Sequence, residues 1–303
     1  MEQTVQTADA SGAASVPLAE AVEEQWFDNF EAGEYPDDLY DYVGTAESIA
    51  DLAAFDGAVE AQFRDQGYAV VRQAFSPAQT EGALQALLDL IDGRRPDFKG
   101  VQFESSARAI LPTLTPEQKQ DYVRKLNAYV EFDDRLQAIA GSPPLLAVVT
   151  RLLGETPHLF ANQAMLKPPL VGREKPWHQD HGFFKLPTGT PIVGVWIALD
   201  EAQPDNGCMH IIPGGHREAR PHFTRRDWQI CDDQIERQRI LAVPLQPGGC
   251  LFFDGLLPHG TPATRSPRRR RALQLHYVPA SVAQISKEEH QAVFSGEARG
   301  LTC

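Results

Sequence analysis

Residues 176–184 read Pro-Trp-His-Gln-Asp-His-Gly-Phe-Phe, and they contain the pair His178-x-Asp180. If this stretch is an extended strand, side chains two positions apart point to the same face. An imidazole nitrogen and a carboxylate oxygen would then converge on one point, as two ligands of a metal ion do. The same two residues would also suit the polar edge of a strand, so the pair needs support from the rest of the chain.

Two residues far downstream supply that support. His259 follows the apolar, strand-like run 249–253, and Arg270 stands eleven residues later, just before a second such run, 271–279. Two histidines and one carboxylate on one side of a metal form the facial triad of non-haem Fe(II) oxygenases, which leaves the opposite positions open. A buried arginine near the metal can hold an acidic cosubstrate through a two-pronged contact. The predicted metal ligands are His178, Asp180 and His259.

The order of these motifs resembles the phytanoyl-CoA dioxygenase family of Fe(II)/2-oxoglutarate oxygenases over about residues 67–279. The stretches that carry the resemblance are His178-Gln-Asp180, residues 195–200, 205–209 and 213–216, and residues 247–272 with His259-Gly260 and Arg270-Arg271-Ala272. The resemblance implies Fe(II) as metal, 2-oxoglutarate as cosubstrate and O2 as oxidant. It also implies that the three metal ligands are the catalytic residues.

The resemblance extends to the cosubstrate pocket. The family's cosubstrate arginine stands eleven residues after the distal histidine, and here that residue is Arg270. Lys125 falls in a predicted helix, where a solvated lysine is the alternative. The further cosubstrate-binding candidates are Ser266, Trp196, Gln163 and Lys125.

Aromatic side chains beside the triad favour an apolar or amphipathic small substrate, such as a lipid-derived acid, a terpenoid or another secondary metabolite. Lys185, or the arginines of residues 216–239, would suit an acid or a CoA phosphate. His181 faces away from His178 in an extended strand. We therefore expect it to contact the substrate or one of the metal-binding side chains, rather than to bind the metal itself. The substrate-contact candidates are Trp177, His181, Phe183, Phe184 and Lys185. His210, His216, His222 and His276 are expected to be structural or surface residues.

Composition bounds the alternatives. The 303 residues are 42% hydrophobic, enough for a large core, and the net charge of −13 argues against binding to a nucleic-acid backbone. Neither an apolar run of 18 residues nor a signal peptide is seen. Four cysteines without metal-type spacing predict a reduced, cytoplasmic protein. The oligomeric state stays open between monomer and homodimer.

The pattern along the chain predicts an α+β fold that is mainly β: a double-stranded β-helix (jelly roll or cupin-like) core with helices packed on one face. Residues 1–60 are expected to form an acidic extension, partly disordered with short helices, before a single domain at 61–303. The insertion 216–239 is either a lid or a surface excursion. Predicted helices are 55–66, 77–92, 116–129 and 143–153. Predicted strands are 68–72, 158–168, 175–184, 192–200, 208–212, 240–245, 249–254 and 271–279.

The reaction implied by the resemblance is hydroxylation of an unactivated C–H bond with release of succinate and CO2. Related iron halogenases replace the carboxylate ligand by a small residue, so the presence of Asp180 favours hydroxylation over halogenation. Desaturation, epoxidation and ring formation remain open. Two readings of other classes are a cupin-like binding protein without turnover and a metal-dependent isomerase.

Overall fold

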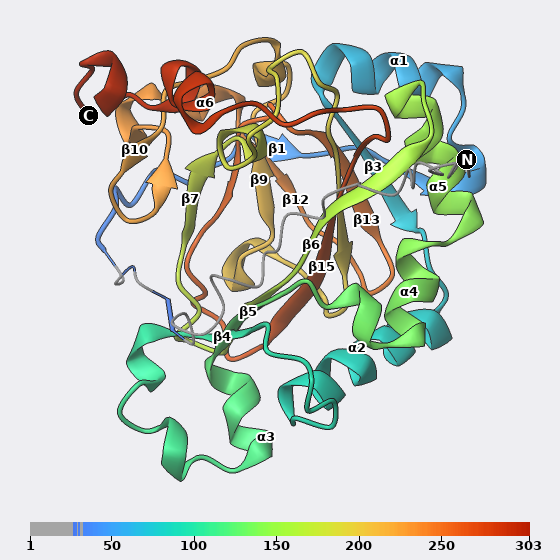
Figure 1. The fold of residues 1–303 in the computed structure, drawn as a ribbon, viewed down its shortest axis with the longest axis vertical. Coiled ribbons are helices and arrows are strands. Elements are labelled where there is room, and N and C mark those ends of the chain that lie inside the picture. Colours follow the sequence, from blue (N-terminus) through green and yellow to red (C-terminus); the bar gives the residue numbers. More distant parts are fainter. Residues whose placement is uncertain (1–26, 29, 31–32) are drawn as a thin grey trace, which may run out of the picture.

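Two β-sheets form the centre of the computed structural model, which describes residues 27, 28, 30 and 33–303 (Figure 1). The larger sheet has the strand order β2 (Ser48–Asp51), β3 (Tyr68–Gln73), β13 (Cys250–Asp254), β8 (Val193–Ala198), β15 (Arg270–Pro279), β6 (Pro157–Lys167), β5 (Val123–Asn127) and β4 (Val101–Phe103). The smaller has the order β1 (Gly44–Thr45), β12 (Leu241–Val243), β9 (Met209–Ile211), β14 (His259–Thr261) and β7 (Lys175–His178). A separate hairpin pairs β10 (Phe223–Thr224) with β11 (Trp228–Gln229).

The two faces of the larger sheet pack in two different hydrophobic cores, because successive side chains of a strand point to opposite faces. On β15, Leu273 and Leu275 belong to a core shared with helices. Ala272, on the other face, belongs to a core that also contains Met209 of β9 and Val243 of β12. The two sheets therefore face each other, and the even-numbered residues of β15 point into the space between them.

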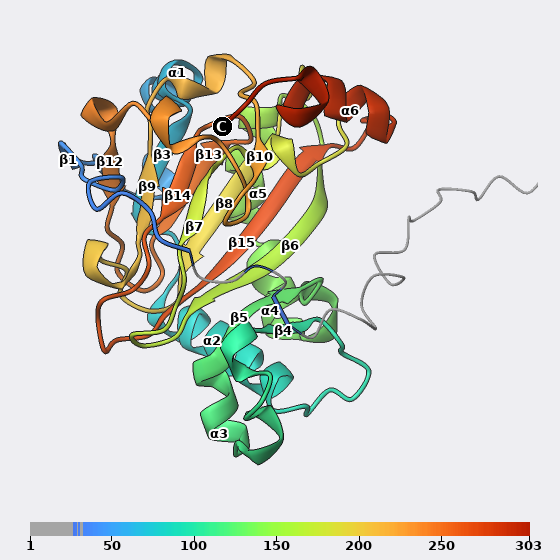
Figure 2. The ribbon, with the colours of Figure 1, turned by 90° about the vertical axis from the view of Figure 1, so that its left-hand side faces the viewer.

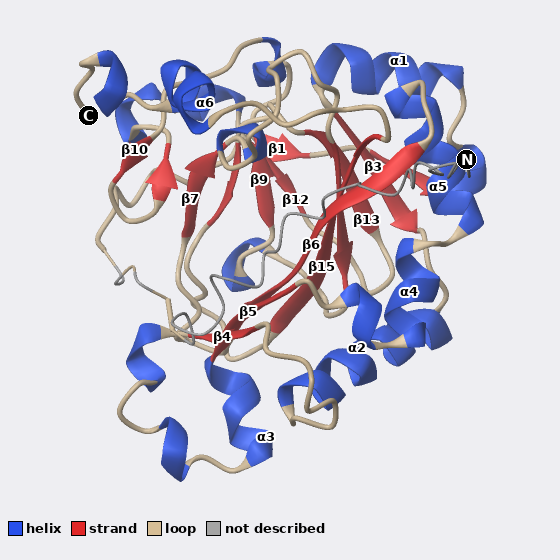
Figure 3. Ribbon diagram, in the orientation of Figure 1, coloured by secondary structure: helices blue, strands red, loops and turns tan. Residues whose placement is uncertain are grey.

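Helices cover the outer face of the larger sheet, on the right in Figure 3. The sequence signals explain their ends. Ser76 and Gln79 form a reciprocal capping box with Pro77 in the first turn of one helix, and Gly67 closes another in the left-handed conformation. The helices of this layer are α1 (Gly57–Gln66), α2 (Pro77–Ile91), α4 (Asp134–Ala140) and α5 (Pro143–Leu153).

Two further helices lie at opposite ends of the molecule, α3 (Pro116–Lys119) at the bottom and α6 (Lys287–Phe294) at the top of Figures 1 and 2. A backbone bridge joins His222 to Ser295, so the chain after α6 lies against the insertion 216–239. Among the described residues, no single helix is long and apolar enough to cross a membrane; α4 and α5 meet that criterion only together, with a bend of 41° between them.

Most predicted elements are confirmed, but the helix expected at 116–129 is wrong. Only Pro116–Lys119 is α-helical, and Val123–Asn127 is strand β5, paired on both sides in the larger sheet. Val123 and Leu126 are fully buried in the core under the helices. Pairing with β4 and β6 therefore outweighs the local helical spacing of the apolar residues.

Residues 1–26, 29, 31 and 32 of the expected extension 1–60 lie outside the described part of the chain. In the described part of residues 1–60, strands β1 and β2 and the 3-10 helix Leu52–Ala54 stand where short helices were expected before α1. Strand β1 pairs with β12 and β2 pairs with β3, so this segment is joined to both sheets. The division of the chain at residue 60 stays a prediction.

The cysteines depart from the expectation of four reduced thiols. Cys231 and Cys303 form a disulfide across a sequence separation of 72 residues, while Cys208 and Cys250 are free and buried. Closing a loop of this length restricts the unfolded chain, so the Cys231→Ser variant should lose about 2–4 kcal/mol of unfolding free energy. Thiol titration of denatured, unreduced protein should find two thiols. Four thiols would contradict the bond.

Candidate active site

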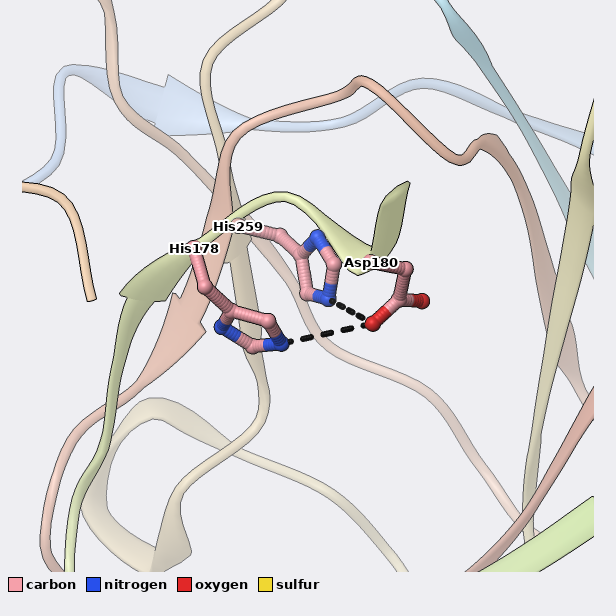
Figure 4. A group of neighbouring side chains, drawn as sticks. All are labelled: His178, Asp180 and His259. Carbon is pink, nitrogen blue, oxygen red and sulfur yellow. Dashed lines mark ion pairs between the residues drawn. The ribbon is translucent and has the colours of Figure 1, made fainter. Parts of the chain in front are cut away.

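Three ligand side chains converge between the two sheets (Figure 4). His178 ends β7 and His259 begins β14, and the two residues lie directly opposite each other in the antiparallel pair. Asp180 Oδ1 is 3.4 Å from His178 Nε2 and 3.7 Å from His259 Nε2. One ligand atom from each residue lies within 4.8 Å of the others, and all three side chains are buried.

Backbone contacts orient both imidazole rings toward that point. His178 Nδ1 lies 2.7 Å from the Pro176 carbonyl, and His259 Nδ1 lies 2.9 Å from the Leu257 carbonyl. A carbonyl only accepts, so each Nδ1 donates a hydrogen, and Nε2 is the nitrogen of each ring that faces Asp180. Burial lowers the pKa of His259 to about 3, which keeps that ring neutral. Two imidazole nitrogens and one carboxylate oxygen fit Fe(II).

Asp180 does not lie on a strand, as the sequence predicted, but on the turn that follows it. The predicted strand 175–184 ends at His178, and Asp180 is the first residue of a 3-10 turn, Asp180–Gly182. The side chain of Gln179 holds this turn in place: its Nε2 donates to the backbone carbonyls of Glu218 and Leu256. Both carbonyls therefore help to fix where the strand ends and the turn begins.

Two residues that the sequence argument passed over contact the second oxygen of Asp180. His276 Nε2 lies 2.6 Å from Oδ2, and Gln274 Nε2 donates to the same oxygen at 3.2 Å. Burial alone would raise the pKa of Asp180, but His276 beside it holds that pKa well below its ordinary value. The signal for both residues was present, because strand alternation places positions 274 and 276 on the same face as Arg270.

The three candidate metal-binding side chains line a cavity of about 300 Å³, and Arg270 lines it too. Arg270 is 2% exposed, donates to the Met165 carbonyl at 2.9 Å and stacks on Trp196 with its guanidinium 5.4 Å from the ring. Its Nε has no hydrogen-bond partner among the described residues, and burial lowers its pKa to about 10. A buried guanidinium with unused donors suits a carboxylate ligand.

Strand register brings three more of the predicted cosubstrate contacts to this cavity. Gln274 lies opposite Gln163 on one side and opposite Trp196 on the other, so the three form a row across β6, β15 and β8. Lys125 lies opposite Met165 in the adjacent pair of strands. Gln163, Trp196 and Lys125 all line the cavity. Lys125 does so from a strand rather than from the predicted helix.

Lys125 gives a prediction about stability and pH. Burial, with the charges of Lys175 and Arg124, lowers the pKa of Lys125 from 10.5 to about 8. The folded state then binds the proton more weakly than the unfolded state, so this destabilisation is full below pH 8 and disappears as pH rises toward 10.5. Lys125→Met should therefore raise the unfolding free energy by about 2 kcal/mol at pH 7. This gain is smaller than the full pKa shift would give, because Lys125 lines the cavity and part of its burial is relieved there.

Chemical denaturation of the metal-free protein measures this effect. The gain of Lys125→Met over the parent chain should shrink between pH 8 and pH 10.5. Lys185→Met, which removes an exposed lysine, is the control and should change stability little at either pH. A Lys125→Met gain that does not vary with pH would contradict the lowered pKa.

The remaining predicted contacts divide into two groups. Phe183 and Phe184 line the cavity as expected for substrate contacts, with Phe183 edge-on to His178 at 5.4 Å. Ser266 is not among the lining residues, and its hydroxyl instead accepts from Arg268. The structure thus places this serine away from the cavity, because it belongs to the irregular segment between β14 and β15 rather than to a strand.

Three substrate-contact candidates also lie off the cavity. Trp177 points away from His178, as adjacent strand residues do: it is fully buried, stacks on Tyr40 and donates to the Leu39 carbonyl. His181 packs on Phe294, with Nε2 3.2 Å from the Thr190 carbonyl. Lys185 is exposed. Adjacency to the triad in sequence did not bring these side chains to the cavity.

Thr261 is a cavity residue that the sequence argument missed. It lies two positions after His259 on β14 and lines the cavity. Its Oγ1 is buried without a hydrogen-bond partner among the described residues, which is a position for contact with a bound ligand. The signal that could have found it is the two-residue strand spacing from His259.

Comparison with known proteins places the chain. The sequence model described as phytanoyl-CoA dioxygenase matches residues 63–272, more than half of the chain. Phytanoyl-CoA dioxygenase domain-containing protein 1 of Danio rerio is 23% identical over 269 residues, which cover 75% of this chain and 91% of that protein. Peroxisomal phytanoyl-CoA dioxygenase of Bos taurus is 28% identical over 180 residues, 55% of this chain and 52% of that one. This chain thus matches about half the length of the bovine protein.

Solved structures agree on the fold. The non-haem α-ketoglutarate-dependent carbocyclase SnoK from nogalamycin biosynthesis has a TM-score of 0.63 at 18% identity, covering 82% of this chain and 94% of that one. EctD from S. alaskensis has a TM-score of 0.62 at 20% identity, covering 84% and 86%. With the family match over 63–272 and the triad in place, the chain belongs to the phytanoyl-CoA dioxygenase family of Fe(II)/2-oxoglutarate-dependent dioxygenases.

Proposed function

We propose that this dioxygenase hydroxylates an unactivated C–H bond of a small molecule and releases succinate and CO2. The observation that carries the proposal is the convergence of His178, Asp180 and His259 on the cavity that Arg270 also lines, with its Nε free of any hydrogen-bond partner among the described residues. A metal triad alone would suit a binding protein or an isomerase. A fixed cation in the same cavity gives an acidic cosubstrate a place beside the metal.

The roles of the chain's own residues follow from their contacts. His178, Asp180 and His259 would hold iron through Nε2, Oδ1 and Nε2, and Arg270 would pair with a carboxylate of 2-oxoglutarate. Iron and 2-oxoglutarate supply the oxidising chemistry when they are bound. The protein supplies orientation and keeps bulk water away, since the three ligand residues are at most 5% exposed.

Asp180 supports hydroxylation among the reactions open to such a site. The carboxylate occupies the position that a small residue takes in the related halogenases, so a halide ligand has no place there. Ring formation, desaturation and epoxidation share the same protein ligands and are distinguished only by the product. Product mass separates them into two pairs: hydroxylation and epoxidation each add one oxygen, whereas desaturation and oxidative ring formation each remove two hydrogens. The structure of the product then distinguishes the members of each pair.

The cavity walls support a small substrate with both apolar and polar groups. Phe183 and Phe184 line one part of the cavity. Lys175 also lines it, paired with Asp227 at 2.7 Å and placed over the Phe183 ring at 4.4 Å. We therefore keep an amphipathic secondary metabolite, a terpenoid acid or a lipid-derived acid as the proposed substrate class.

Three finer features belong to the same proposal. The two facing sheets are interpreted as a double-stranded β-helix. The insertion 216–239 is proposed to act as a lid, and Asp227 on the turn of its hairpin lines the cavity. A cytoplasmic location stays a proposal, whereas the expectation that all four cysteines are reduced does not stand beside the disulfide between Cys231 and Cys303.

The experiment is a screen for 2-oxoglutarate-dependent succinate release with Fe(II) and O2. Terpenoid acids, fatty acids and acyl-CoAs are offered in turn, and each product is analysed by mass. Substrate-dependent succinate with a product heavier by one oxygen is expected. Fe(II)-dependent binding of 2-oxoglutarate without succinate from any substrate class would instead favour a binding protein. His259→Ala is the control that should release no succinate.

A further inference from the structure

The two oxygens of Asp180 face different partners. Oδ1 faces His178 Nε2 and His259 Nε2, at 3.4 and 3.7 Å. Oδ2 turns away from them and lies 2.6 Å from His276 Nε2 and 3.2 Å from Gln274 Nε2. One oxygen is thus available to a metal, while the other is already occupied by protein donors.

The contact with His276 fixes which ring nitrogen carries hydrogen. An ionised carboxylate only accepts, so His276 Nε2 must donate to Asp180. His276 Nδ1 is buried and has no hydrogen-bond partner in the described part of the chain. The ring is 1% exposed and packs edge-on against Phe184 with centroids 4.9 Å apart. Its orientation is therefore set by packing as well as by the hydrogen bond.

Strand β15 supplies the rigid base for this contact. Arg270, Gln274 and His276 lie on its inward face, and β15 is paired along its length with β6 and with β8. Gln274 Nε2 donates to Asp180 Oδ2 beside it, and its 3.1 Å distance to His276 Nε2 joins two donor nitrogens, so the two side chains share the acceptor rather than bond to each other. The same strand thus carries the guanidinium proposed for the cosubstrate and the two groups that contact the metal carboxylate.

We propose that His276, assisted by Gln274, is a positioning residue that restricts Asp180 to binding the metal through one oxygen. The inference rests on the iron site and function proposed above. A carboxylate that binds through both oxygens occupies one more metal position than a carboxylate that binds through one. By engaging Oδ2, His276 keeps a position open that a two-point cosubstrate and O2 together require.

Cobalt binding to the metal-free protein tests this role without turnover. His276→Phe keeps a ring of similar size but removes the N–H donor, whereas His276→Gln retains a donor. Since loss of a hydrogen bond to a metal ligand typically weakens metal binding by about 10–100-fold, His276→Phe should bind Co(II) at least about tenfold more weakly. Its ligand-field spectrum should also change, and His276→Gln should recover both properties to within about threefold.

The control is His210→Phe, which removes another buried histidine, on β9, whose ring does not line the cavity. It should leave the Co(II) affinity and spectrum unchanged. If His276→Phe does not fold, Gln274→Leu gives a second test, with a changed spectrum expected. A folded His276→Phe with parental affinity and spectrum would overturn the positioning role, whereas a parent chain that binds no Co(II) would contradict the proposed function itself.

Discussion

Asp180→Ala is expected to abolish succinate release, with a loss of at least about 1,000-fold, equivalent to about 4 kcal/mol. The substitution removes the oxygen that lies nearest both His178 Nε2 and His259 Nε2. It also leaves His276 and Gln274 without their shared acceptor. Iron binding and turnover should therefore be lost together. Iron content and 2-oxoglutarate consumption of the purified variant measure the two effects.

Asp133→Ala separates this effect from the loss of any buried carboxylate. Asp133 is also buried, but it caps helix α4 and pairs with Arg135, away from the cavity. Loss of the cap should lower stability by about 0.5–2 kcal/mol and leave iron content unchanged. Parental turnover in Asp180→Ala would contradict the assignment of the metal ligands.

The second large effect is expected from Arg270→Ala. If Arg270 pairs with a carboxylate of 2-oxoglutarate, removal of the guanidinium takes away the direct ion-pair partner of that buried carboxylate. The apparent 2-oxoglutarate requirement should rise about 100-fold, equivalent to about 2.7 kcal/mol. Maximal turnover should fall less than this, because the metal ligands are untouched. Initial rates over a range of 2-oxoglutarate concentrations measure the change.

The neighbouring arginine provides a matched control. Arg271 points to the opposite side of β15 and is paired with Asp200 at 2.7 Å. Arg271→Ala should keep the parental 2-oxoglutarate requirement. Arg270→Lys keeps the charge but loses the two-pronged geometry, so its requirement should lie between those of the parent chain and Arg270→Ala. An unchanged requirement in Arg270→Ala would show that another cation holds the far carboxylate.

The sequence predicts an element correctly where its apolar side chains follow the regular period of a strand or a helix. Apolar periodicity predicts the strands at 192–200, 249–254 and 271–279, and glycine caps predict the ends of the helices closed by Gly67 and Gly154. The prediction of His178 and His259 as metal ligands rests on the His178-x-Asp180 pair, on the runs around His259 and Arg270, and on the family resemblance. The same period, applied consistently, would have turned Trp177 outward and would have brought Gln274 and His276 inward. The sequence therefore contains the information that places these three side chains.

Other features depended on contacts that spacing does not reveal. Lys125 sits in a segment with helical spacing, and only pairing between β4 and β6 makes it a strand residue that faces the cavity. Ser266 lies in a segment without regular structure, so its distance of four residues from Arg270 did not fix where its hydroxyl points. The disulfide between Cys231 and Cys303 joins residues 72 positions apart, and no local sequence pattern predicts it.

The most direct measurement of the central claim is made without oxygen. Fe(II) is added to the metal-free protein, followed by 2-oxoglutarate, and the weak visible charge-transfer absorption of the chelated cosubstrate is recorded. The arrangement of His178, Asp180, His259 and Arg270 predicts that this band appears in the parent chain and is absent from Asp180→Ala. Well-folded parent protein that binds Fe(II) and 2-oxoglutarate without the band would contradict the account.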